Sequence, residues 1–346
     1  MKLELEIINP TEYPLWDELV LATKNYSFFH SSGWAKVLHE SYGYRPLYFT
    51  LIKNSKLMIL IPLMEVKSIL TGKRAVSLPF SDYCEPLVPE KEDPQEILDY
   101  IFKYGKQAGW KSIEIRDGKI FSQDLPVASS YYIHTLDISK SNAQVFDGFR
   151  DSTKRNIKKA MKEDIKIDIS NSLESLNEFY RLNCITRKKH GLPPQPYYFF
   201  KKVYEHILSK KHGIVVLAMY NKTTVAGAVY FHFGDKAIYK YGASDENYQH
   251  LRANNLIMWN AIKWFSQNGY KSLFFGRTEA ENKGLKRFKK GWGTTESIIK
   301  YYKYDLLKGT FIHKSPQLSQ VQKKIFSKLP RFLLRTTGSL LYKHIG

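Results

Sequence analysis

The pattern of apolar and polar positions predicts strands in two separate parts of the chain. An opening strand is expected over 3–8, and alternating β-branched and aromatic residues on both sides of the polar turn at 53–56 predict a hairpin. Three further segments, 213–220, 224–233 and 236–244, alternate in the same way and predict an antiparallel meander. Each half of the chain is therefore expected to contain antiparallel strands.

Helical periodicity occurs between these strands. The segments 34–41, 94–108, 173–189 and 254–266 carry apolar residues at helical spacing. Glycines that follow three of these segments predict where the helices end. Short apolar strands are expected directly after the second and fourth helices, over 110–116 and 270–276.

A further helix is expected over 145–165 and would join the two halves of the chain. Its apolar residues fall on one helical stripe, formed by Val145, Phe149, Ile157, Met161 and Ile165. Lysine and arginine side chains cover its other faces. A solvated basic face and a groove for a polyanion both fit this pattern.

A repeat relates the two halves. Residues 104–118 align with residues 264–278: in both, a helix end is followed by a glycine, an aromatic residue, Lys-Ser and a strand. We therefore predict an α/β (α+β) protein with two tandem copies of one fold, each with a mixed antiparallel and parallel sheet flanked by helices. The expected first domain is 1–144, the second is 145–305 with its basic linking helices, and 306–346 is a basic amphipathic C-terminal tail, which we expect either to pack back on the first domain or to lie on a membrane.

The composition of the chain limits the classes of molecule that it is expected to bind. The formal net charge is +20 and the sequence pI is about 9.6, which favours nucleic acid, phosphate-bearing substrates or an acidic membrane surface. Two cysteines exclude a disulfide framework, and neither a metal site nor a secretory signal is expected. The longest apolar run, 57–64, is too short to span a bilayer. A cytoplasmic location, with peripheral attachment to the inner face of the plasma membrane as a further option, is the expectation.

The stretch 284–293 is the candidate functional loop. Its glycines, four cationic side chains and two aromatic rings follow an apolar strand, and such a loop brings backbone amides and ammonium groups to an anionic ligand. An ordinary solvated basic turn fits the same ten residues.

Six segments taken in order give the chain a resemblance to a known family. They begin at Gly33 (GWAKVL), Ser152 (STKRNIKKA), Phe179 (FYRLNCITRKKHGLPPQP), Leu251 (LRANNLIMWNAIKW), Phe275 (FGRT) and Gly284 (GLKRFKKGWG). Together they resemble the Fem-type aminoacyltransferases that build the interpeptide bridge of peptidoglycan, within the GNAT acyltransferase superfamily. The resemblance covers about residues 25–305 and implies two tandem GNAT-like acyltransferase domains.

The resemblance implies roles for particular residues. Lys36 matches the family's diphosphate-binding lysine, and Arg187 is the best match for its arginine partner. Phe288 and Lys289 match a catalytic pair, in which the ammonium holds the donor or stabilises a developing oxyanion. The remaining substrate-binding candidates are Trp34, Asp82, Tyr83, Arg252, Asn255 and Arg277.

The donor is expected to be aminoacyl-tRNA, with no bound cofactor. Acetyl-CoA enzymes of the superfamily cradle a pyrophosphate on a glycine-rich loop, whereas Arg252 and Asn254 stand at the corresponding positions here. The acceptor would be an amino group of a lipid-linked or nucleotide-linked cell-wall or glycan precursor. One alternative is an N-acyltransferase that uses acyl-CoA or an acyl carrier on an amino sugar of an exported polysaccharide. Another is a non-catalytic polyanion-binding protein; DNA is not an expected partner.

Overall fold

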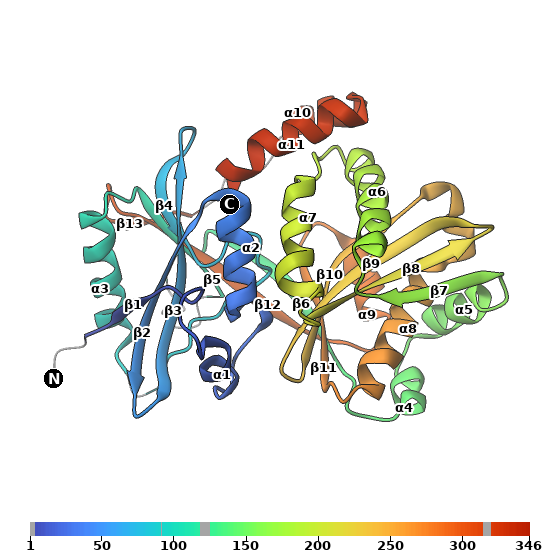
Figure 1. The fold of residues 1–346 in the computed structure, drawn as a ribbon, viewed down its shortest axis with the longest axis horizontal. Coiled ribbons are helices and arrows are strands. Elements are labelled where there is room, and N and C mark those ends of the chain that lie inside the picture. The colour runs from blue at the N-terminus through green and yellow to red at the C-terminus, as the bar shows by residue number, and fades with distance from the viewer. Residues whose placement is uncertain (1–3, 91, 118–124, 314–319) are drawn as a thin grey trace. The chain divides into compact units, whose positions relative to one another are not determined.

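A computed structural model of the chain describes residues 4–90, 92–117, 125–313 and 320–346 (Figure 1). The chain divides into two compact units. The first unit is Met1–Tyr131, Ile298–Gln317 and Leu340–Gly346, and the second is Tyr132–Ser297 and Leu318–Ser339. The first boundary thus lies after 131 and not after 144. Residue 3 of the expected opening strand and residues 314–319 of the expected tail lie outside the described residues.

The first unit is a mixed sheet with strand order β1-β2-β3-β4-β5-β12, and β13 pairs with β12. The strands β2, β3 and β4 form an antiparallel meander, and β5 is parallel to β4 after the crossover helix α3. The predicted hairpin turn is confirmed, with Asn54 and Ser55 at φ 49° and 58°, as a tight two-residue turn requires. The elements are β1 (Glu6–Ile8), α1 (Trp16–Leu21), η1 (Phe28–His30), α2 (Ser32–Tyr42), β2 (Arg45–Lys53), β3 (Lys56–Ser68), β4 (Gly72–Val76), α3 (Pro94–Gln107), β5 (Ser112–Arg116), β12 (Thr295–Asp305) and β13 (Thr310–Phe311).

The second unit repeats this arrangement. The strands β7, β8, β9 and β10 are antiparallel neighbours, and β11 is parallel to β10 after the helix α8. Strand β6 lies beside β11. The elements are β6 (Ser129–Asp137), α4 (Asn142–Asp147), α5 (Asp151–Ala160), β7 (Ile165–Ser170), α6 (Leu173–Lys189), α7 (Tyr197–Val203), η2 (Tyr204–Leu208), β8 (Gly213–Tyr220), β9 (Thr223–Phe233), β10 (Lys236–Ser244), η3 (Glu246–Leu251), α8 (Ala253–Gln267), β11 (Ser272–Glu279), α9 (Lys283–Lys290) and α10 (Gln320–Lys328).

The predicted sequence repeat is present in the backbone hydrogen bonds. At the end of α3, the amides of 108, 109 and 110 donate to the carbonyls of 104, 106 and 105. At the end of α8, the amides of 268, 269 and 270 donate to the carbonyls of 264, 266 and 265. Gly109 (φ 73°) and Gly269 (φ 84°) both adopt the left-handed conformation that ends a helix in this way. The two units are therefore copies of one fold, as the sequence predicted.

Helices cover both faces of the sheet in the second unit (Figure 1). On one face, Ile257 and Phe265 of α8 pack in one cluster with Val216 and Ala228 of the sheet. On the other face, Phe179 of α6 approaches the sheet so closely that a Cβ on Gly227 would lie 3.3 Å from its ring. Alternate strand residues thus face opposite helix layers, which explains why these strands are apolar along their whole length.

The expected helix over 145–165 is wrong. Helix α4 ends at Gly148, Arg150 has extended backbone angles, and α5 ends at Ala160. Met161, expected in the buried stripe, is exposed, and Ile165 pairs with Tyr220 as the first residue of β7. The break follows from tertiary bonding, because the amide of Arg150 donates to the carbonyl of Gly291 instead of continuing α4.

The described part of the C-terminal tail contains the short strand β13 and two helices, α10 and α11 (Arg331–Ile345). Leu340–Gly346 belong to the first unit, where Tyr44 Oη donates to the carbonyl of Tyr342 at 3.0 Å. Among the described residues, no helix has the length and apolar character needed to cross a bilayer.

Candidate active site

The candidate site of the second unit lies where β10 and β11 separate. Their parallel pairing covers Lys236–Ile238 with Ser272–Phe274, at the beginning of each strand. A bulge between Tyr239 and Tyr241 then changes the register of β10 against β9. Beyond this point the two strands run on to Ser244 and Glu279, and backbone groups of β11 there meet side-chain partners.

Lys289 supplies one such partner. Its Nζ donates to the carbonyl oxygens of Gly276 at 2.9 Å and Arg277 at 3.1 Å, and the side chain is 2% exposed. Successive carbonyls of a regular strand point in opposite directions, but Gly276 has φ 67°, which allows both to face one ammonium group. The structure thus brings together three predicted features, the FGRT segment, Arg277 and Lys289. The predicted catalytic role of Lys289 stays a prediction, because its two described acceptors are backbone carbonyls.

The predicted basic loop 284–293 is helical over 284–290, so the expectation is wrong for these residues. Asn282 caps α9 by accepting from the amide of Leu285, and the helix ends at Gly291. The apolar spacing that signals a helix is scarce in this lysine-rich segment, which is why the sequence pattern indicated a loop. Phe288 is half-buried and meets Trp292 edge-on, with ring centroids 6.0 Å apart.

The glycines of this segment differ in what they do. A Cβ on Gly293, which has φ 68°, would lie 2.7 Å from the carbonyl oxygen of Gly148. A Cβ on Gly291 would lie 2.6 Å from Thr153 Oγ1. By contrast, Gly284 has only Asn282 Oδ1 nearby, at 3.9 Å. Close packing against the start of α5 therefore requires glycine at 291 and 293, and nothing comparable requires it at 284.

A charged cluster that the sequence reasoning missed lies beside α9. His134 Nε2 is 3.0 Å from Glu296 Oε2, and Glu296 also pairs with Lys286 at 3.1 Å and Lys290 at 3.3 Å. Burial, reinforced by the nearby charge of Lys289, lowers the pKa of His134. Burial acts to raise the pKa of Glu296, but the two lysines outweigh it and lower that pKa. The signal in the sequence was the i, i+4 spacing of Lys286 and Lys290, which places both on one helix face.

Three buried polar atoms in this region have no hydrogen-bond partner among the described residues. They are Thr278 Oγ1 on β11, Trp292 Nε1 after α9 and His134 Nδ1 on β6. Buried groups with unused hydrogen-bonding capacity are uncommon in folded proteins and are expected where a polar ligand binds. They extend the candidate site beyond the residues predicted from sequence.

Arg252 and Asn255 lie together at the start of α8. Arg252 has φ 59° and its carbonyl accepts from the amide of Asn255 at 2.9 Å. Its backbone thus has the left-handed conformation that glycine adopts most easily, but it carries a long exposed cation. Asn255 is buried.

The predicted residues of the first unit gather around Phe29. Trp34 is fully buried and meets Phe29 edge-on at 5.5 Å, and Tyr83 meets the same ring at 6.0 Å. Burial raises the pKa of Tyr83. The backbone carbonyl of Asp82 accepts from Tyr301 Oη at 2.5 Å. The structure therefore gives Trp34 a place in the core, beside the loop that carries Asp82 and Tyr83.

The proposed diphosphate pair is divided between the units. Lys36 lies half-exposed on α2 of the first unit, and Arg187 lies near the end of α6 in the second. Arg187 Nε donates to the carbonyl of Pro193 at 3.2 Å, where the chain turns out of α6. Joint binding of a diphosphate by Lys36 and Arg187 stays a prediction.

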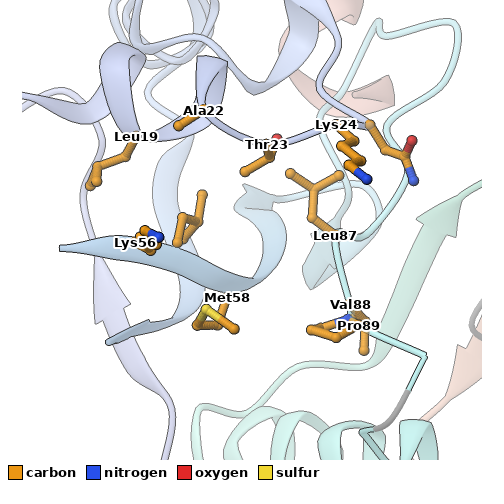
Figure 2. A pocket seen from close by; sticks show the side chains of 11 residues that line it. Leu19, Ala22, Thr23, Lys24, Lys56, Met58, Leu87, Val88 and Pro89 are labelled. Carbon is orange, nitrogen blue, oxygen red and sulfur yellow. The ribbon is translucent and has the colours of Figure 1, made fainter. Parts of the chain in front are cut away.

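A separate pocket of about 560 Å³ lies in the first unit between α1, β3 and the segment 87–89 (Figure 2). Its lining is mainly aliphatic, including Leu19, Met58 and Leu87, with Lys24 and Lys56 among the polar members. None of the predicted site residues lines it. The pocket is thus distinct from the candidate active site.

Comparison with known proteins adds to this geometry. Residues 148–290 match the acetyltransferase (GNAT) domain family. The chain is similar to the lipid II:glycine glycyltransferase of Staphylococcus haemolyticus, at 28% identity over 123 residues, or 32% of this chain and 28% of the relative. The enzyme of the same name from Staphylococcus aureus is 29% identical over 121 residues, or 31% of this chain and 28% of the relative. The match thus spans little more than a quarter of these relatives' length.

Solved structures extend the likeness to the whole chain. The structure of FemX superposes with a TM-score of 0.68 at 16% identity, covering 94% of this chain and 100% of the other. This shared fold agrees with the family match and with the sequence similarity to the glycyltransferases, and the three together support the resemblance to Fem-type GNAT acyltransferases. The chain also shares its fold with a tandem GNAT protein from the clavulanic acid biosynthesis pathway, at a TM-score of 0.53 and 7% identity over 91% of the chain. The predicted fold class and the predicted resemblance are therefore confirmed.

Proposed function

We propose that this Fem-type protein is an aminoacyltransferase that forms an amide on an amino group of a cell-wall precursor, with aminoacyl-tRNA as donor. The observation that carries the proposal is that sequence similarity to lipid II:glycine glycyltransferases coincides with a fold like that of FemX along almost the whole chain. The acceptor would be lipid-linked or nucleotide-linked. The reaction would take place in the cytoplasm, where charged tRNA is available.

The chemistry requires positioning more than a strong base. The acceptor amine attacks the ester carbonyl of the donor, the tetrahedral intermediate carries an oxyanion, and the tRNA hydroxyl leaves with a proton taken from the amine. Cationic side chains and backbone amides that face the gap between β10 and β11 would stabilise the oxyanion. Lys289 fixes the carbonyls of Gly276 and Arg277, and so orients the peptide groups of β11 around that gap.

Arg252 supports the choice of donor. A glycine in the left-handed conformation before a helix leaves the first amides of that helix open to a pyrophosphate, whereas the residue with this conformation before α8 is Arg252, which carries a long side chain. The same guanidinium can pair with a backbone phosphate of tRNA. Arg252 is thus proposed to contact the donor.

The test measures transfer from charged tRNAs to a lipid-linked precursor and to its nucleotide-linked form, by mass spectrometry. We expect a product heavier by one amino-acid residue, and an Arg252→Gly variant with a KM for charged tRNA raised about tenfold, the effect of one lost charge-assisted contact. Lys222→Gly is the matched control, because Lys222 is an exposed cation at φ 62° in the same unit. No transfer from any charged tRNA would refute the proposal.

A second candidate function keeps the fold and changes the donor to an acyl-CoA. The left-handed backbone at Arg252 favours it, since this is the conformation of the glycine-rich loop in acetyl-CoA enzymes. Thermal stabilisation of the protein by acetyl-CoA, with none by charged tRNA, would select this function over the first.

A further inference from the structure

The turn between β3 and β4 exposes two large aliphatic side chains. Ile69 is 91% exposed and Leu70 is 64% exposed, although both lie within a well-packed unit. Gly72 at φ 77° completes the turn, and Ser68 Oγ accepts from the amides of Leu70 and Thr71 at 3.1 and 3.0 Å. The turn is thus held in a defined shape that presents its apolar residues to solvent, which folding alone does not explain.

The end of α11 is fastened to this turn. Ser68 Oγ and His344 Nδ1 are 3.1 Å apart, and Thr71 Oγ1 donates to the carbonyl of His344 at 3.4 Å. Arg74 donates to the same carbonyl at 2.9 Å and to that of Gly346 at 2.5 Å. These bonds place the last helical turn of α11 beside Ser68–Thr71.

Two more exposed aliphatic residues lie on that end of α11. Ile345 follows His344 directly and is 57% exposed, and Leu340 is 60% exposed. Leu340 is four residues before His344 and therefore lies on the same face of the helix, the face that meets the turn. We call Ile69, Leu70, Leu340 and Ile345, together with Lys67 and Lys343, the Ile69 surface.

The charge around these residues is positive. Lys67 and Lys343 are exposed, and the nearest acid on β3, Glu65, is buried and pairs with Lys73 at 3.0 Å and with Lys67 at 3.8 Å. An apolar tip ringed by cations complements a bilayer surface of anionic lipid, where aliphatic side chains enter the acyl boundary and ammonium groups stay at the phosphates.

We propose that the Ile69 surface binds the protein to an anionic membrane. This inference rests on the proposed function, since a lipid-linked acceptor is presented at such a surface. Ile69 and Leu70 insert, and Leu340, Ile345, Lys67 and Lys343 lie at the level of the headgroups. The surface is exposed and cationic, and a membrane fits it better than a second copy of this basic chain, which like charge would repel.

The test is sedimentation of the full chain with vesicles of equal parts phosphatidylglycerol and phosphatidylcholine. Wild type is expected to bind, less so at high salt, and not to bind phosphatidylcholine alone. The Ile69→Asp/Leu70→Asp double variant is expected to bind about a hundredfold more weakly, about one factor of ten for each aliphatic side chain withheld from the bilayer. Lys67→Glu/Lys343→Glu is expected to lose the preference for the anionic lipid.

Leu307→Asp is the matched control, because Leu307 is 76% exposed in the same unit and lies in the turn between β12 and β13. It is expected to bind like wild type. The proposal is overturned if wild type does not bind the anionic vesicles, if the double variant binds as well as Leu307→Asp, or if the double variant only converts a dimer to a monomer. Transfer to the lipid-linked precursor dissolved in detergent, with no bilayer present, is measured on the same variants and separates the two ideas. It stays unchanged in the variants if the surface serves only the membrane. Its absence in wild type, together with absence of transfer to the nucleotide-linked form, counts against the proposed function alone.

Discussion

Replacing Lys289 with methionine tests the central contact of the candidate site. Methionine keeps most of the side-chain volume but removes the ammonium, so the carbonyls of Gly276 and Arg277 lose a shared donor. A hydrogen bond to a charged group contributes about 1.5–3 kcal/mol, and part of the total is recovered because the ammonium no longer has to be desolvated. We expect a net loss of about 3 kcal/mol and, for a unit of this length, a melting temperature lower by roughly 6–12 °C.

The assay is thermal unfolding followed by circular dichroism, with Lys290→Met as control. Lys290 is the next residue of α9, and its exposed pair with Glu296 contributes about 1 kcal/mol at most. Equal melting temperatures for the two variants would refute the structural argument. Transfer activity is then measured well below both transitions. A loss of kcat in folded Lys289→Met would support the predicted catalytic role, whereas wild-type kcat would eliminate it.

Two further predictions concern stability. Gly293→Ala should lower the free energy of unfolding by at least about 2 kcal/mol, because its Cβ would meet the carbonyl of Gly148 and its backbone is left-handed. Gly284→Ala should raise it by about 0.5 kcal/mol through greater helix stability. Equal midpoints of the two variants in urea unfolding would contradict both expectations. Burial, with a smaller effect of His212, lowers the pKa of His232 to about 4. Below about pH 6.5 His232 binds a proton in the unfolded chain but not in the native protein. The free energy of unfolding should therefore fall by about 3 kcal/mol as the pH drops to 4. His232→Asn should flatten this dependence in urea unfolding, and replacement of the exposed His250 should not; an unchanged slope in His232→Asn would be the contrary result.

The repeat was the part of the fold that could be predicted most fully. The glycines at 109 and 269 end their helices through the same three hydrogen bonds. All the bonded residues are close in sequence, so the local sequence is enough to predict where the helix ends. The meander strands were predictable for a similar reason, because their apolar runs and polar turns are local signals.

The wrong expectations share a cause. Arg150 leaves the helical path because a carbonyl from Gly291 accepts its amide, and α9 forms with only two apolar side chains, Leu285 and Phe288. Gly291 is far from Arg150 in the sequence, so the local pattern does not signal this contact. The burial of Lys289 was not predicted for the same reason. A lysine in a basic segment is normally exposed, whereas the ammonium of Lys289 is buried because it donates to the carbonyls of Gly276 and Arg277, which are distant in sequence.

The interruption of the first unit by the second has a practical consequence. In the first unit, the rings of Tyr131 and Tyr301 are 4.8 Å apart, so the chain leaves and returns at neighbouring strands. In the second, the contact between His134 and Glu296 brings its own two ends together in the same way. Apart from residues 318–339, the second unit is therefore suited to removal, or to circular permutation, with short linkers. It is equally suited to exchange for the second unit of a relative. The donor preference of such a hybrid would then report which unit selects the donor.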